Sequence, residues 1–375
     1  MQKSIGSKPH YALLDGMRGV AALTVLLYHV FECFATTPVP HGHLAVDFFF
    51  VLSGFVIGYA YDQRWTQMST ATFFKRRLIR LHPMVVMGAI IGLATYLIQG
   101  ATRWDGTAPG LSAIIIALLA AMFLIPATPG SPIDVRGNNE MFPLNGPSWS
   151  LFFEYIGNVL YALLLRRMPT KMLAIVAAAS GVLLTTIAVS ESQLGVGWSF
   201  IDGGFFKGLV RMLFPYSTGM LLARHIQKKE AQNRRLSATL TFACCSLAFI
   251  AIAAMPKLGS DKMPWANGLF EALCVVAAFP LLVWLGSQTT NPAEPTKRLC
   301  LFIGNLSYPL YAVHYPLMYL FYHYIGFDGT NSKLTIAQVW PEAILLFAGS
   351  IALGWLCLKC YEAPVRKRLS AKLAP

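Results

Sequence analysis

Three ionisable residues lie within one apolar segment near the start of the chain, residues 11–31. They are Asp15, Arg18 and His29. An ionisable side chain at the centre of a membrane segment costs at least about 2.5–3.5 kcal/mol, so each of the three is a candidate functional residue. Arg18 and His29 are eleven positions apart. On a helix this spacing places both on nearly the same face, about 16 Å apart along the axis.

This arrangement suggests chemistry centred on His29. Histidine is the most frequent general base because its pKa lies near neutrality. It can take the proton of a hydroxyl group while the oxygen attacks a carbonyl. A carboxylate, either Asp47 or Glu154, would orient the imidazole, and a positive charge would stabilise the oxyanion. Spacing alone does not decide between the two carboxylates. Each is equally well interpreted as a member of an ion pair between helices.

A basic cluster suggests where a charged cofactor would bind. Lys75, Arg76, Arg77 and Arg80 place four cations within six residues, which suits the phosphates of a nucleotide. A basic loop that faces the cytoplasm or anionic lipid is the alternative interpretation. Other polar side chains in or next to apolar segments are candidates for substrate or oxyanion contacts: Arg211, Tyr308 and His314. No spacing of His, Cys and Asp indicates a metal site.

The composition places these residues in a membrane protein. Of the 375 residues, 55% are hydrophobic and 13% are charged, whereas a soluble domain carries about 25% charged residues. The deficit of charge runs along the whole chain, which predicts one polytopic membrane domain over residues 1–375. The net charge of +13 comes mostly from a few basic clusters between apolar segments, so it does not indicate a nucleic-acid partner.

The apolar segments predict an all-α membrane fold. A membrane-spanning helix needs about 20 mostly apolar residues. Eleven segments qualify as candidates: 11–31, 44–61, 83–100, 111–126, 149–165, 172–190, 205–223, 237–255, 268–286, 299–324 and 341–361. Cytoplasmic loops are rich in Lys and Arg. All the basic clusters lie on the cytoplasmic side of the membrane only if one of the eleven candidate segments does not cross the membrane. The segment 111–126 is the shortest and ends at Pro126. We therefore expect about ten spans, an additional re-entrant or interfacial segment near 111–126, and both termini in the cytoplasm.

Six motifs in this chain resemble those of the acyltransferase-3 family of membrane O-acyltransferases. The resemblance covers nearly the full length in the order Leu14–Gly19 with His29, Val46–Phe55, Phe74–Arg80, Pro147–Leu151 with Glu154, Gly304–Tyr311 with His314, and Glu362–Pro364. Met17 departs from the family pattern, in which leucine is usual. The chain stops soon after Glu362, so it resembles the stand-alone members that have no appended periplasmic domain.

The resemblance implies an activity. Members of this family take an acyl group, usually acetyl, from cytosolic acyl-CoA and move it to a sugar hydroxyl of a cell-envelope or exported polysaccharide at the bacterial inner membrane. The family implies that His29 is essential, that Arg18 supports activity, and that Arg77 and Arg80 serve the CoA side. The expected partners are therefore the lipid bilayer and a glycan acceptor, while the oligomeric state is not predicted.

Several alternatives stay open at this point. The hydroxyl could attack the thioester directly, or His29 could carry the acyl group transiently. The acceptor could be a small molecule such as a macrolide, or a lipid. A transporter is the alternative from another class, because intramembrane charges also line transport pathways. A transporter would move its substrate without consuming CoA and would often show inverted repeats, which the sequence does not reveal.

Overall fold

The computed structural model describes residues 10–34, 36–229, 236–289, 292–327 and 332–372, which fold into helices without a β-strand. The first seven α-helices are α1 (Ala12–Phe31), α2 (Ala45–Tyr61), α3 (Thr70–Ile98), α4 (Leu111–Met122), α5 (Ser148–Leu163), α6 (Thr170–Ser190) and α7 (Gly204–Lys229). The others are α8 (Ala238–Ala254), α9 (Trp265–Leu273), α10 (Phe279–Ser287), α11 (Glu294–Tyr324), α12 (Ile336–Cys357) and α13 (Ala363–Ala371).

Short turns complete or join several of these helices. The 3-10 turns are η1 (Gly42–Leu44) before α2, η2 (Leu165–Arg167) after α5 and η3 (Ile201–Gly203) before α7. The π-helical turn η4 (Cys274–Ala278) joins α9 to α10 without a break, and η5 (Leu358–Glu362) joins α12 to α13 in the same way. Each of the eleven predicted segments therefore has a helical counterpart.

The lengths and hydropathies confirm an all-helical membrane fold. Among the described residues, seven helical segments are long and apolar enough to cross a membrane, namely those that contain α1, α2, α3, α5, α6, α9–α10 and α12–α13. Helices α7 and α11 are also long, with 26 and 31 residues, but are more polar. The 12 residues of α4 extend over about 18 Å, well short of the roughly 30 Å hydrocarbon core. This length agrees with an additional, non-spanning segment near 111–126.

The basic cluster of residues 75–80 lies in a helix, whereas the sequence analysis placed it in a loop before a span beginning at residue 83. Helix α3 begins at Thr70, and the Ser69 hydroxyl caps it by accepting the amide of Thr72 at 3.1 Å. The helix continues through Pro83. Proline is tolerated inside membrane helices because neighbouring groups satisfy the backbone there. A proline that was interpreted as a helix start therefore lies in the middle of α3.

The centre of the bundle is built from two tightly packed helix pairs, α1 with α11 and α2 with α7. Glycine permits both close approaches. A side chain at Gly54 would lie 1.9 Å from the carbonyl oxygen of Tyr216 on α7, and one at Gly304 would lie 2.6 Å from Cβ of Asp15 on α1. The second contact fixes the inner end of α11 directly against the polar residues of α1.

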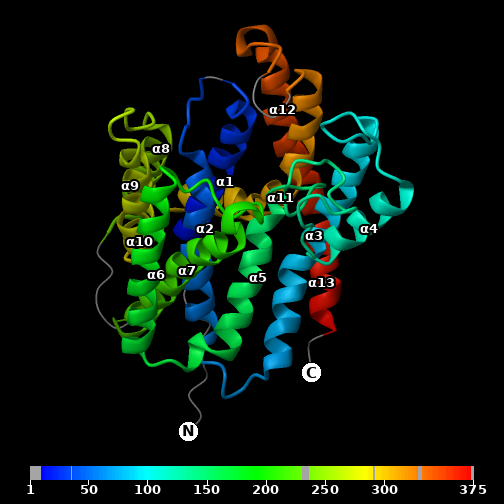
Figure 1. The fold of residues 1–375 in the computed structure, drawn as a ribbon. Coiled ribbons are helices and arrows are strands. Elements are labelled where there is room, and N and C mark those ends of the chain that lie inside the picture. Colours follow the sequence, from blue (N-terminus) through cyan, green and yellow to red (C-terminus); the bar gives the residue numbers. More distant parts are fainter. Residues whose placement is uncertain (1–9, 35, 230–235, 290–291, 328–331, 373–375) are drawn as a thin grey trace.

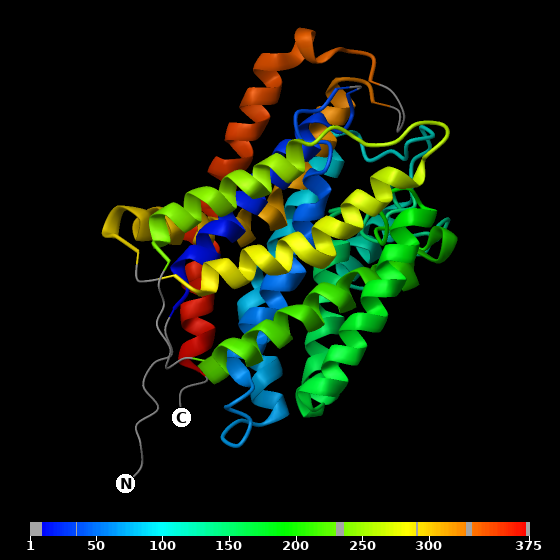
Figure 2. The ribbon, with the colours of Figure 1, turned by 90° about the vertical axis from the view of Figure 1, so that its left-hand side faces the viewer.

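Basic segments gather at one end of the bundle. The connection between α2 and α3, the turn η2 and the end of α13 all lie at the lower end of Figure 1, and the turn that leads into α12 lies at the upper end. Figure 2 shows the same separation from the side, with α8 and α9–α10 strongly inclined across the bundle. Arg64, Arg166, Arg167 and Arg366 belong to the lower set, as expected if this end faces the cytoplasm. We call the basic end of the bundle the inner end and the opposite end the outer end.

Candidate active site

Arg18 is fixed at the inner end of the α1–α11 contact. Its Nε donates to the hydroxyl of Ser307 at 2.9 Å, and its Nη2 donates to the carbonyl of Gly304 at 2.7 Å. Asp15, one turn earlier on α1, lies 3.2 Å from Nη2. The side chain is one quarter exposed and contributes to two cavities. Arg18 is thus a positioned cation that still faces open space.

Glu154 forms an ion pair with Arg77. Its Oε1 accepts Nη2 of Arg77 at 2.8 Å and the hydroxyl of Ser53 at 2.8 Å. Glu154 was a predicted partner of His29, but the structure places it on the arginine side. Glu154 lies there because the segment that leads into α5 runs inside the protein, where residues 141–150 are all buried. Because α5 begins inside the protein, one further turn carries Glu154 toward the inner end.

The three arginines of the basic cluster have different surroundings. Arg80 lies 3.6 Å from the buried carboxylate of Glu362, which also pairs with Arg366 at 2.8 Å. Arg77 and Arg80 both line a cavity next to Arg18. Arg76 is exposed, lines none of the cavities described below, and has no hydrogen bond or ion pair within the described part of the chain. Two of the three arginines are therefore placed to contact a bound molecule.

A series of cavities leads from these arginines to His29. The cavity beside Arg18, Arg77 and Arg80 has a volume of about 170 Å³. It shares Arg18 and Arg80 with a cavity of about 430 Å³ on the inner side. On the outer side it shares Val46 and Tyr311 with a cavity of about 380 Å³ that contains His29. The three cavities therefore adjoin one another in a row, beside the face of α1 that carries both Arg18 and His29.

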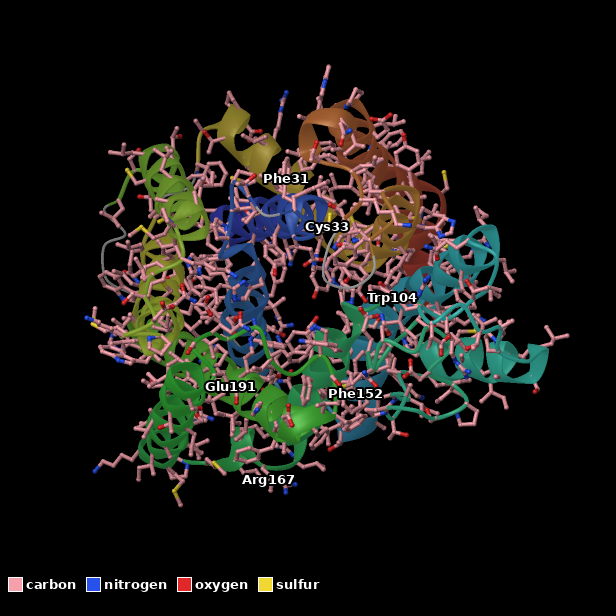
Figure 3. The ribbon with its side chains drawn as sticks, turned by 45° about the horizontal axis from the view of Figure 1, so that its top comes forward. Phe31, Cys33, Trp104, Phe152, Arg167 and Glu191 are labelled. Carbon is pink, nitrogen blue, oxygen red and sulfur yellow. The ribbon has the colours of Figure 1, made fainter. Side chains whose placement is uncertain are left out.

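Figure 3 brings forward the upper end of the bundle, where α1 ends at Phe31. Trp104, which lines the His29 cavity, lies beside the central opening between α1, α2 and α11. Arg167 and Glu191 lie at the periphery. The outer cavity is therefore enclosed by the central helices and by loop residues above them.

His29 lies on the last turn of α1 and has a carboxylate next to it. Its Nδ1 is 2.9 Å from Oε1 of Glu32, close enough for an ion pair although the angle is not that of a hydrogen bond, and its side chain is 15% exposed. The hydroxyl of Tyr322 donates to the same Glu32 oxygen and, at 3.0 Å, to the His29 carbonyl. The sequence analysis did not single out Glu32. Its position three residues after His29, on the same helix face, was the available signal.

His314 faces His29 from α11. The two imidazole centroids are 5.4 Å apart, and the Tyr315 ring packs edge-on against His29 at 4.8 Å. Nδ1 of the fully buried His314 lies 2.9 Å from the Tyr311 carbonyl. A carbonyl only accepts hydrogen bonds, so Nδ1 carries the proton. Nε2 is then a buried acceptor, and it has no partner among the described residues.

Asp47 pairs with Arg211 rather than with a histidine. The pair is bidentate, with Nε to Oδ1 at 2.9 Å and Nη2 to Oδ2 at 2.7 Å, and both side chains are buried. Arg211 also donates to the carbonyls of Val196 and His43. It lines the His29 cavity, so the pair fixes one wall of that cavity by tying α2 to α7.

Tyr308 belongs to the inner part of the route. Its hydroxyl donates to the carbonyl of Leu81 on α3, and the residue lines the cavity beside Arg77 and Arg80. Of the three residues predicted to contact the substrate or the oxyanion, only Arg211 is in the lining of the His29 cavity, while His314 packs against the His29 ring.

A second histidine–carboxylate cluster adjoins this cavity. Glu271, fully buried on α9, lies 2.9 Å from Nδ1 of His41 and 3.3 Å from Nε2 of His43. It also accepts the amide of Leu194 and the side chain of Asn267. His43 lines the His29 cavity. This cluster was not predicted, although an acidic residue within the apolar segment 268–286 was a signal. Within the described residues, no three metal-binding side chains are arranged to hold an ion.

Comparisons with known proteins identify the family of this chain. The acyltransferase-3 family model, described as an acyltransferase domain, matches residues 11–359. Acyltransferase MdmB of Streptomyces mycarofaciens is 30% identical over 96% of this chain and 92% of its own length. "Protein 2 in picA locus" of Rhizobium radiobacter is 33% identical over 48% of this chain and 94% of its own length. A putative O-acetyltransferase of Staphylococcus aureus strain COL is 23% identical over 84% of this chain and 52% of its own length. No solved structure matches.

Proposed function

This chain belongs to the acyltransferase-3 family of membrane O-acyltransferases, and on that premise we propose that it acetylates a polysaccharide across a membrane. The donor is cytosolic acetyl-CoA or another acyl-CoA. The acceptor is a sugar hydroxyl of a cell-envelope or exported polysaccharide. In this proposal the protein lies in a bacterial inner membrane, with its basic end and both termini in the cytoplasm.

The series of cavities between the arginines and His29 carries the proposal. Arg18, Arg77 and Arg80 line its inner part, where their guanidinium groups suit the phosphates of CoA. The pantetheine arm would lie along the face of α1, which separates Arg18 from His29 by about 16 Å. The thioester would then reach the His29 cavity, and the acceptor would enter that cavity from the opposite end.

His29 acts as the general base in this proposal, and Glu32 orients it. Because Nδ1 of His29 faces Glu32, Nε2 is the nitrogen available to the acceptor. It takes the proton of the sugar hydroxyl as the oxygen attacks the thioester carbonyl. The C–O bond forms, the C–S bond breaks, and the imidazolium returns the proton to the departing thiolate. The balance is the same if His29 first carries the acetyl group and then passes it on.

The other predicted residues have supporting roles. His314 packs against the ring of His29 and helps to hold it in place. Arg211 and Asp47 fix the cavity wall, and the charge of Arg211 favours an oxyanion nearby. Glu154 holds Arg77 in place for the donor. Asp47 and Glu154, the two carboxylates first considered as partners of His29, are thus assigned to the arginines, and Glu32 takes the orienting role.

A transfer assay tests this function. Purified full-length protein in lipid nanodiscs is incubated with radiolabelled acetyl-CoA and a panel of glycans and lipids. We expect label to move onto a glycan, and His29→Ala to reduce the transfer by about 10²–10⁴-fold, the usual contribution of a general base. His225→Ala, which changes an exposed histidine on α7, is the matched control. Full transfer by the His29 variant would overturn the assignment.

A further inference from the structure

A fourth cavity adjoins the His29 cavity at its outer end. Its volume is about 270 Å³, and it shares Trp104, Tyr322 and Phe327 with the His29 cavity. Arg103 and Arg136 also line it. The proposed route for acetyl-CoA does not use this space. Because the two cavities adjoin, a molecule bound here that is long enough to extend past the shared residues would reach the neighbourhood of His29.

Arg136 is a buried cation held in one orientation. Only 3% of its surface is exposed. Its Nε donates to the Pro143 carbonyl at 2.6 Å, and its Nη1 donates to the Gln99 side chain at 2.8 Å. The guanidinium carbon lies 3.6 Å from the centroid of the Tyr319 ring. The remaining nitrogen, Nη2, is buried and has no acceptor among the described residues, which is a costly state for a charged donor.

Arg103 adds a second positive charge without a neutralising partner. Neither Arg103 nor Arg136 has a carboxylate within 4.0 Å in the described part of the chain. Asp134 lies close by in the chain, but its carboxylate oxygens accept the amides of Gly130 and Gly137. Nearby, Glu140 accepts the Tyr319 hydroxyl. The cavity therefore presents two arginines whose charge a ligand can balance.

Aromatic rings give the cavity a flat apolar wall beside this charge. Trp104 is 40% exposed and packs edge-on against Phe327, with ring centroids 5.8 Å apart. The apolar face of a pyranose ring fits against such a wall, while guanidinium groups bind carboxylate and phosphate through paired hydrogen bonds. A neutral sugar would satisfy the ring contact but would leave Arg103 and Arg136 unbalanced.

We infer that this cavity is an acceptor subsite for an acidic glycan. It binds an anionic group, a carboxylate or a phosphate, through Arg103 and Arg136, and Trp104 packs against the sugar ring. A hydroxyl of the neighbouring sugar then reaches Nε2 of His29 by passing beside the residues that line both cavities. This inference rests on the proposed function and specifies the chemical class of its acceptor.

Binding of matched sugars to the full-length protein in nanodiscs tests this inference. The probes are a glucuronic acid oligosaccharide, the same oligosaccharide with its carboxyl groups reduced to alcohols, and glucose 6-phosphate. We expect at least one acidic probe to bind ten times more tightly than the reduced oligosaccharide. Which acidic probe binds more tightly distinguishes a carboxylate from a phosphate ligand. Equal binding of all three probes, or no binding by any, would overturn the inference.

Substitutions locate the binding. Arg103→Gln and Arg136→Gln should each remove most of the preference for the acidic probe, and Arg136→Lys should retain part of it. Lys262→Gln, an exposed cation in the loop between α8 and α9, should leave it unchanged. Because Arg136 is packed inside the protein, the binding of each of its variants is measured at a temperature the same number of degrees below its own melting temperature. If the Arg136 variants do not fold, Arg103→Gln alone tests the inference. An acidic preference that survives both arginine substitutions would contradict the inference.

A second readout separates this inference from the proposed function. The release of CoA from acetyl-CoA, with His29→Ala as the blank, reports whether the enzyme uses the donor. If His29-dependent release occurs with acidic and reduced oligosaccharides equally, only the acidic subsite is wrong. If no probe or glycan gives His29-dependent release, the proposed function fails.

Discussion

Glu32 lies one helical turn beyond His29 on α1, and its carboxylate oxygen is 2.9 Å from the imidazole Nδ1. The hydroxyl of Tyr322 on α11 contacts the same carboxylate oxygen and the His29 carbonyl. One tyrosine therefore fixes both members of the pair. The contact is an ion-pair distance without hydrogen-bond geometry, and the proposed function assigns Glu32 the role of orienting His29 as a general base.

Glu32→Gln should lower kcat for acetyl transfer by about tenfold to a hundredfold with little change in the KM for acetyl-CoA. The amide keeps the size of the side chain but loses the charge that stabilises the imidazolium in the transition state. Steady-state kinetics at a fixed acceptor concentration measure kcat and the KM for acetyl-CoA separately. A change in KM alone would contradict an orienting role, and Tyr322→Phe should show a smaller loss of kcat in the same direction.

Asp47→Asn should act on stability first. Breaking a buried ion pair by removing one charge costs about 3–5 kcal/mol because the other charge stays buried. The variant should therefore unfold at a lower temperature, as measured by thermal denaturation in detergent. Exchanging both Asp47 and Arg211 for apolar residues of similar size should restore part of the loss. A variant with normal stability and abolished activity would instead show that Asp47 acts directly in catalysis.

Arg77→Gln and Arg80→Gln should raise the KM for acetyl-CoA about tenfold or more, and Arg76→Gln should change it less than twofold. The three residues lie within five positions of one helix, but only Arg77 and Arg80 line the inner cavity. Arg76 is therefore a matched control for charge and for helix position. A similar rise in KM for all three would indicate a diffuse effect of positive charge and not a defined binding site.

Glu140 should make stability depend on pH. Burial raises the pKa of this carboxyl from 4.5 to about 7. The folded protein thus binds more protons than the unfolded chain between these two values, so stability should fall as the pH rises from about 4.5 to 7. Melting temperatures at pH 5, 6, 7 and 8 measure the slope. Glu140→Gln should flatten it, and an unchanged slope would show that other groups cause the dependence.

The helices and the two ends of the site follow from the sequence because they depend on local patterns. Each apolar segment has a helical counterpart, and the spacing of Arg18 and His29 along α1 is a property of any helix. The partners of the charged residues depend on helix packing. Glu154 meets Arg77 because α5 begins inside the protein, and Asp47 meets Arg211 because glycine brings α2 and α7 together.

Glu32 and Arg136 were not predicted, for different reasons. Glu32 lies just beyond the apolar segment that ends at residue 31, and only ionisable residues inside the apolar segments were considered as candidates. Arg136 lies in an irregular loop between α4 and α5, outside the apolar segments that predict the helices. Its burial between aromatic rings comes from the path of that loop, which no hydropathy pattern encodes.

Acetyl transfer across a sealed membrane tests the central claim most directly. Inverted membrane vesicles from cells that express the protein expose its cytoplasmic side to added radiolabelled acetyl-CoA, while the acceptor polysaccharide is enclosed inside. We predict that wild-type vesicles incorporate label into the enclosed polysaccharide and that His29→Ala vesicles, with equal amounts of folded protein, do not. Equal incorporation by both vesicles would contradict the account.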